Sequence, residues 1–67
     1  MAASYKKLWK LLIDKDMKKQ DLAKSAHISN YTISKLTKGE NVTTDILGRI
    51  CKALECNIDD IMEFIED

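Results

Sequence analysis

Proline is absent from this chain of 67 residues, and glycine occurs only twice, at Gly39 and Gly48. An all-β fold needs many more turn-forming residues than this, so the composition indicates an all-α fold. The longest uninterrupted apolar run covers residues 11–13, which is far too short for a membrane span or a signal peptide. We therefore expect one cytoplasmic domain over residues 1–67 and no membrane partner.

Metal-binding and catalytic residues are scarce as well. His27 is the only histidine, and the two cysteines, Cys51 and Cys56, stand five positions apart. A zinc site needs two further ligands, and a cytosolic chain rarely keeps a disulfide, so we interpret both cysteines as small apolar residues. The chain offers neither a nucleophile paired with a base nor a glycine-rich phosphate loop. We expect no metal, no cofactor, no small-molecule ligand and no enzymatic activity.

Charge of one sign is concentrated in each half of the chain, although the net charge is zero. Residues 1–39 carry nine lysines and three aspartates, a net charge of +6, whereas residues 40–67 carry a net charge of −6. Such an asymmetry is typical of a protein with a nucleic-acid-binding half. A lysine-rich surface that contacts only water has the same composition, so the charge alone leaves both interpretations open.

The spacing of apolar residues predicts five short helices. Three segments, 5–13, 46–54 and 58–65, carry apolar residues at helical spacing, and Ser4 is the expected N-cap of the first. Four apolar pairs stand at i and i+5, the spacing of a hydrophobic staple around a helix start: Met17 with Leu22, Ile28 with Ile33, Val42 with Leu47, and Cys56 with Ile61. The N-cap positions of these starts hold Ser29, Thr43, Asn57 and, as an exception that cannot accept a hydrogen bond, Lys18. The predicted helices cover 4–15, 19–26, 30–38, 44–54 and 58–65.

The segment from 19 to 39, KQDLAKSAHISNYTISKLTKG, resembles the helix-turn-helix of the phage repressor/Cro-like (Xre-type) regulators. The likeness continues through residues 42–54 and 57–61 and covers the chain from about residue 8 to residue 65. It is closest to small stand-alone members of that family. The resemblance implies a five-helix, lambda-repressor-like DNA-binding domain whose helix-turn-helix is formed by residues 19–26 and 30–38.

Three positions depart from the family pattern. His27 occupies the turn where the family has glycine, so we expect a left-handed backbone there at a cost of about 1 kcal/mol. Lys19 replaces the usual glutamine at the start of the second helix, and Glu55 stands where a helix-ending glycine is common. Gly39, by contrast, fits the position after the helix at 30–38. Two residues keep open roles: Gly48 is a surface glycine or a close-contact site, and Trp9 is half-buried or part of a partner surface.

The resemblance implies that the helix at 30–38 enters the major groove of double-stranded DNA and presents its first residues to base edges. Asparagine can pair with adenine and lysine with guanine, while a tyrosine ring or a threonine methyl can contact the methyl group of thymine. The residues assigned to base edges are Asn30, Tyr31, Thr32, Ser34 and Lys35. The residues assigned to backbone phosphates flank this helix: Lys18, Lys19, Gln20, Ser29, Lys38, Asn41 and Thr43.

The helix at 58–65 carries more apolar surface than one small core can cover from a single side. Relatives in the family pair through this end, so we expect a homodimer on palindromic DNA. The dimerisation candidates are Ile58, Met62, Phe64 and Ile65. The expected function is sequence-specific transcriptional regulation in the cytoplasm, associated with the nucleoid. The alternative is a protein-interaction module, antitoxin-like or anti-regulator, that uses the same fold and the apolar C-terminal helix.

Overall fold

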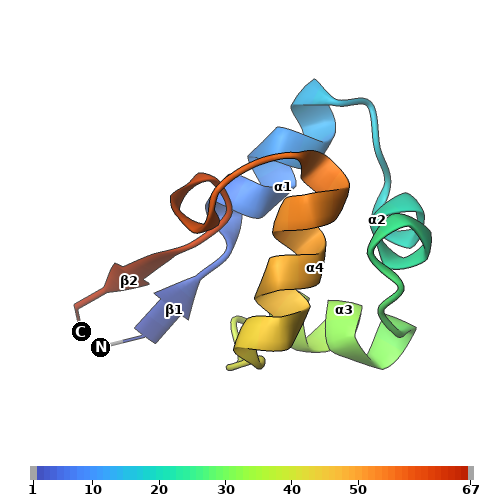
Figure 1. Ribbon diagram of the computed structural model, residues 1–67. Helices are drawn as coiled ribbons and strands as arrows, with labels where there is room; N and C mark the ends of the chain where they lie inside the picture. Colours follow the sequence, from blue (N-terminus) through green and yellow to red (C-terminus); the bar gives the residue numbers. More distant parts are fainter. Residues whose placement is uncertain (1, 67) are drawn as a thin grey trace.

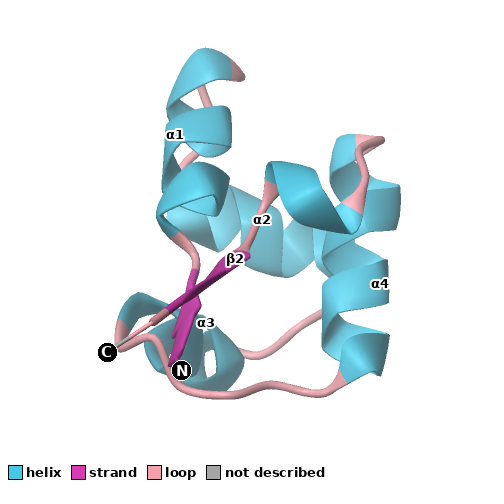
Figure 2. Cartoon of the chain, turned by 90° about the vertical axis from the view of Figure 1, so that its left-hand side faces the viewer, coloured by secondary structure: helices cyan, strands magenta, loops and turns pink. Residues whose placement is uncertain are grey.

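The computed structural model describes residues 2–66, which form four α-helices and a two-stranded sheet (Figure 1). In chain order the elements are β1 (Ala2–Ser4), α1 (Lys6–Asp14), α2 (Lys19–Ala26), α3 (Asn30–Thr37), α4 (Thr44–Leu54), the 3₁₀ turn η1 (Ile58–Asp60) and β2 (Glu63–Ile65). Figure 2 looks from the side of the sheet and shows the two strands in front of the helices, with α3 at the lower end. The short connection between α2 and α3 makes these two helices a helix-turn-helix.

The three central helices agree with the sequence pattern. α2 and α4 have the predicted bounds, and α3 ends one residue earlier, at Thr37. The Ser29 and Thr43 hydroxyls cap α3 and α4 by accepting the backbone N–H groups of Thr32 and Ile46, at 3.2 and 3.3 Å. Local side-chain chemistry therefore sets where these helices begin.

The prediction of a helix over 58–65 is wrong, and with it the all-α, five-helix architecture. After the single turn η1 the chain becomes extended, and β2 pairs antiparallel with β1 so that Ala3 lies opposite Phe64. An eight-residue helix is marginal unless one face is buried, and the residues of β2 are all exposed. Pairing with the opposite end of the chain satisfies their backbone groups instead. Only Ile61 of this segment is fully buried.

The first helix also begins later than predicted. It runs from Lys6 to Asp14, because Ser4 belongs to β1. The N-cap position is occupied by Tyr5, whose side chain makes no capping hydrogen bond, and Ser4 is 7% exposed. The expectation that Ser4 is the N-cap is therefore wrong by one position. Lys7 ties this helix to the C-terminal segment by donating to the carbonyl oxygen of Asp59 at 3.1 Å.

One apolar core joins the helices to the C-terminal segment. Its most deeply buried side chains come from α1, α2, α3, α4 and the residue after η1. They are Leu8, Leu22, Leu36, Ile50 and Ile61. The sheet covers the end of this core with short strands and contributes little burial of its own. Within residues 2–66, no helix has the length and apolar character needed to span a bilayer.

Residues with a left-handed backbone follow α2, α3 and α4, and the sequence predicted this for the first two. His27 ends α2 at φ 56°, and Gly39 follows α3 at φ 74°. Glu55 also takes φ 53° after α4, so that turn closes fully without glycine: the N–H of Cys56 donates to the carbonyl of Cys51 at 3.0 Å. A β-carbon on Gly48 would meet nothing within 4 Å, which agrees with a surface glycine.

Candidate nucleic-acid interface

The recognition-helix candidate, α3, is anchored by its inward face. Ile33 and Leu36 are 8% and 1% exposed and belong to the core. At the start of the helix, the Ser29 hydroxyl also lies 3.1 Å from that of Thr32. Because its start is capped and its apolar face is buried, α3 holds its remaining side chains in defined directions.

The opposite face of α3 carries the five residues assigned to base edges. Asn30, Tyr31 and Ser34 are exposed, and Thr32 and Lys35 are half-buried. Tyr31 is 73% exposed, and the ammonium group of Lys35 lies 5.8 Å from the centre of its ring. This i, i+4 contact places an aromatic ring beside a cation on the outer face, a combination suited to the edges and methyl groups of bases.

Three phosphate candidates lie at the start of α2. Lys18, Lys19 and Gln20 are all exposed. The N–H of Lys18 donates to the Asp21 carboxylate at 2.9 Å, which is the hydrogen bond that an acidic residue at the third helical position makes in a capping box. Gln20 lines a shallow pocket with Ser29 and Asn30, so the starts of α2 and α3 share one surface.

The remaining phosphate candidates follow α3. Lys38, Asn41 and Thr43 are exposed in the connection to α4, and Lys38 is the C-cap of α3. The Tyr5 hydroxyl donates to the carbonyl oxygen of Glu40 at 3.2 Å, which attaches this connection to the start of α1. The predicted residues therefore lie on both sides of α3, and the loop that carries three of them is held in place.

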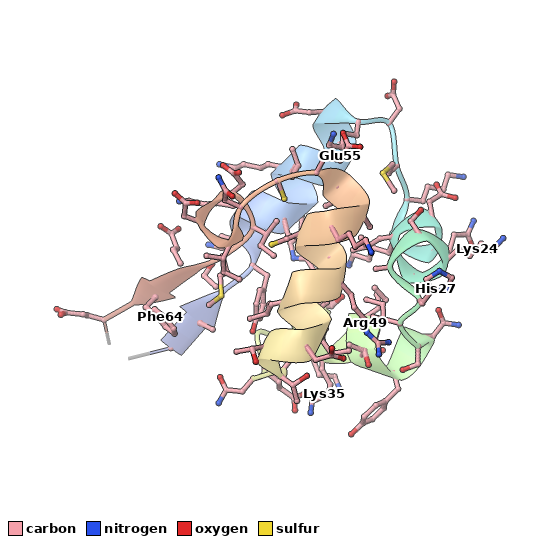
Figure 3. All side chains as sticks on the ribbon, in the orientation of Figure 1. Lys24, His27, Lys35, Arg49, Glu55 and Phe64 are labelled. Atoms are coloured by element: carbon pink, nitrogen blue, oxygen red, sulfur yellow. The ribbon has the colours of Figure 1, made fainter. Side chains whose placement is uncertain are left out.

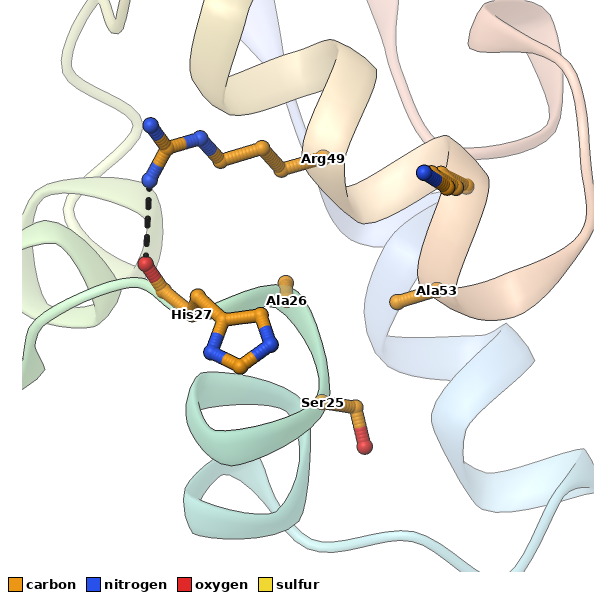
Figure 4. A pocket seen from close by; sticks show the side chains of 6 residues that line it. Ser25, Ala26, His27, Arg49 and Ala53 are labelled. Carbon is orange, nitrogen blue, oxygen red and sulfur yellow. Dashed lines mark hydrogen bonds between the residues drawn. The ribbon is translucent and has the colours of Figure 1, made fainter.

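The turn between α2 and α3 has a contact that sequence reasoning missed. The guanidinium of Arg49, on α4, donates to the carbonyl oxygen of His27 at 3.1 Å (Figure 4). The same guanidinium pairs with Asp45 at 3.0 Å. His27 and Arg49 line an open pocket of about 530 Å³ with Ser25, Ala26, Lys52 and Ala53. Arg49 follows His27 by twenty-two positions, so no local pattern signals the contact.

The two cysteines are free and half-buried at the end of α4. Burial raises the pKa of the Cys56 thiol above its ordinary value of 9.0. Among residues 2–66, no three histidine, cysteine, aspartate or glutamate side chains are grouped to hold a metal ion. Both cysteines pack against the core, which agrees with the interpretation of small apolar residues.

The dimerisation candidates lie toward the sheet, although Ile65 lines a pocket together with Leu36, Thr37 and Lys38 at the end of α3. Figure 3 shows Phe64 on the sheet side of the molecule, whereas Lys35 lies at the lower end. Phe64 is 65% exposed, and Ile58 and Ile65 are each 46% exposed. Met62 is half-buried and packs against the core. The structure thus brings three of the four to the surface on the 3₁₀ turn η1 and on β2, and not on an α-helix.

A helix-turn-helix with a polar, exposed second helix and lysines on both flanks defines a DNA-binding domain. Residues 7–67 match the family of Cro/C1-type helix-turn-helix DNA-binding domains, and the chain belongs to this family. It is similar to the crystal structure of the transcriptional regulator VanUg (Form II), with 47% sequence identity and a TM-score of 0.94. The alignment covers 98% of this chain and 88% of that one. No curated protein sequence matches the chain.

The predicted class of function is thereby confirmed. The chain is a helix-turn-helix DNA-binding transcriptional regulator, and its family is a non-enzymatic one. The alternative interpretation, a protein-interaction module, depended on an apolar C-terminal helix. That segment is a 3₁₀ turn and a strand, so the alternative loses the element on which it was built.

Proposed function

We propose that α3 is the recognition helix and reads base edges in the major groove with Asn30, Tyr31, Thr32, Ser34 and Lys35. The observation that supports this most strongly is the division of the helix into two faces. Its apolar residues are buried, and its polar residues and Tyr31 point away from the core. Polar groups on this outer face that make no hydrogen bond within the protein remain available for hydrogen bonds with bases.

The DNA backbone is held on both sides of α3. Lys18, Lys19 and Gln20 contact phosphates from the start of α2, and Ser29 does so from the start of α3. Lys38, Asn41 and Thr43 contact phosphates from the connection to α4. Their exposure supports this assignment, and the lysines among them supply the positive charge that phosphates require. The whole chain acts as one DNA-binding domain in the cytoplasm, at the nucleoid.

Two copies bind palindromic DNA as a homodimer through the terminal sheet. A single domain with a few phosphate contacts binds weakly, and a two-fold pair doubles the contacts. Phe64, Ile65 and Ile58 are exposed apolar side chains near the end of the chain, and β1 and β2 each have one unpaired edge within the two-stranded sheet. These properties suit a second copy of the chain.

The DNA contacts are tested by the salt dependence of binding. The full chain is titrated into fluorescent duplexes, including sequences selected from a random pool, at several salt concentrations. The slope of log affinity against log salt should be about −0.9 for each phosphate that a lysine neutralises, and therefore about −2.7 for one domain if Lys18, Lys19 and Lys38 are all engaged. A slope near zero on every duplex would contradict the assignment.

The dimer is tested separately by sedimentation velocity. Phe64→Ser with Ile65→Ser should shift the protein toward monomer, because it removes the apolar surface at β2. Ile13→Ser is a matched control, since Ile13 is 73% exposed on α1, outside the sheet. Equal sedimentation of all three proteins, as dimers or as monomers, would exclude the terminal sheet as the dimer surface.

A further inference from the structure

The only tryptophan of the chain lies beside one of the phosphate candidates. Trp9, on α1, is half-buried, and the ammonium group of Lys19 lies 4.6 Å from the centre of its ring. This distance is within the range of a cation–π interaction, and tryptophan is the ring that favours it most. The face of Trp9 therefore attracts the cation at the first residue of α2.

A third helix holds the same ammonium group. The Thr37 hydroxyl of α3 donates to the carbonyl oxygen of Ile33 at 2.9 Å, which uses its single proton. Its oxygen remains to accept, and Lys19 Nζ donates to it at 3.1 Å. The ammonium is thus held by α1 and α3 at once, although Lys19 belongs to α2.

We propose that Trp9 is a positioning residue for DNA binding, which holds Lys19 ready for a backbone phosphate. The proposal rests on the proposed role of Lys19 as a phosphate contact. A lysine ammonium has three N–H donors, and Thr37 takes only one of them. Because the side chain is already ordered in the free protein, it loses less conformational freedom when a phosphate arrives.

The surface beside Trp9 has the charge that a phosphate requires. Trp9 and Thr37 line a shallow pocket of about 260 Å³ together with Lys6 and Lys38. No acidic residue is among the described residues that line it. Lys6 and Lys38 therefore add positive charge beside Trp9 and Thr37, the two residues that hold Lys19.

The test is a double-mutant cycle on the full chain, with a fluorescent DNA duplex of mixed sequence as the probe. Trp9→Leu should weaken binding about two- to five-fold while the salt slope stays unchanged, because Lys19 still meets the phosphate but is no longer held. Lys19→Met should make the salt slope less steep by about 0.9, because one phosphate is no longer neutralised. In the Lys19→Met background, Trp9→Leu should change the affinity by less than about 1.5-fold, since the ring then has nothing to position.

Two conservative variants keep the test valid if Trp9→Leu unfolds. Trp9→Phe keeps an aromatic face and should retain part of the affinity that Trp9 contributes. Thr37→Val replaces the hydroxyl that accepts from Lys19 with a methyl group. Both should weaken binding only when Lys19 is present. The emission of Trp9 is an independent measurement: adding duplex should change it in the wild type and not in Lys19→Met.

Two results would overturn the proposal. If Trp9→Leu weakens binding equally in both backgrounds, Trp9 supports only the fold. If Trp9→Leu strengthens binding, the ring competes with the phosphate for Lys19. Absence of salt-dependent binding by the wild type itself would overturn the proposed DNA contacts as well, and this result is visible before any variant is made.

Discussion

The hydrogen bonds that shape the helix-turn-helix join residues close in sequence, whereas those of the terminal sheet join residues from opposite ends of the chain. In residues 19–37 the caps and left-handed turns join residues at most five positions apart, as in the contact between Ser29 and Thr32. In the sheet, Ala2 pairs with Ile65, at the opposite end of the chain. The comparison teaches that the ends and turns of the helix-turn-helix are specified locally, whereas the proposed assembly surface depends on the two ends of the chain meeting.

The two regions also differ in what they bury. Both helices of the helix-turn-helix supply core residues, and their outer faces are polar. The strand β2 supplies none, although Phe64 and Ile65 are apolar. Substitutions should therefore affect folding in the first region and association in the second.

The largest expected effect is on the inner face of α3. Ile33→Ala should lower the free energy of unfolding by about 2–4 kcal/mol, because Ile33 is 8% exposed and a cavity would remain. Urea denaturation followed by circular dichroism measures the change. A loss below about 1 kcal/mol would mean that α3 is held mainly from elsewhere.

The next effect concerns the outer face of the same helix. Lys35→Ala should relax discrimination at one base pair by about 1–3 kcal/mol, leaving the other preferences unchanged. Lys38→Ala is the matched control: it should weaken binding to all duplexes equally and reduce the salt slope by about one unit. Binding to a panel of single-base variants of a selected duplex measures both. If Lys38→Ala alters the preferred sequence and Lys35→Ala does not, α3 docks in another register.

A smaller effect should appear where the two regions meet. Tyr5→Phe removes the hydrogen bond to the Glu40 carbonyl and should cost about 0.5–1.5 kcal/mol at neutral pH. Burial raises the pKa of the Tyr5 phenol above its ordinary 10.0, so the folded protein favours the protonated form. Its contribution is complete below about pH 10 and is lost as the pH rises through the raised pKa. The melting temperature should therefore fall more steeply between about pH 8 and about pH 11 for the wild type than for Tyr5→Phe. Parallel curves for the two proteins would contradict this.

The turn of the helix-turn-helix should respond in the opposite direction. His27→Gly should raise stability by roughly 0.5–1 kcal/mol, because glycine takes a positive φ without strain. The hydrogen bond from Arg49 uses the backbone carbonyl of His27, so it should survive. A lower melting temperature would show that the imidazole ring makes a stabilising contact.

The smallest effect on folding is expected in the sheet. Phe64→Ala should change the free energy of unfolding of the monomer by no more than about 0.5 kcal/mol, because the ring is 65% exposed. Denaturant titration at low protein concentration measures it. A loss as large as that of Ile33→Ala would mean that the terminal sheet carries part of the fold and that the contrast between the two regions is false.

Much of the candidate interface was predictable because its signals are local. The caps Ser29 and Thr43, the left-handed turn at His27 and the buried face of α3 all follow from residues within one or two helical turns. The contacts of Lys19 with Trp9 and Thr37, and that of Arg49 with His27, were not predictable. They join separate helices, and no spacing in the sequence encodes them.

The sequence by itself determined the helix-turn-helix, the family to which it belongs and the polarity of α3, because apolar periodicity and caps act within one helix. Only the tertiary structure decided the state of residues 58–65. Their apolar spacing fits a helix, but a helix there would leave its backbone ends and most of its apolar face without partners. The strand β1, at the other end of the chain, provides hydrogen bonds to β2 that no local sequence pattern can predict.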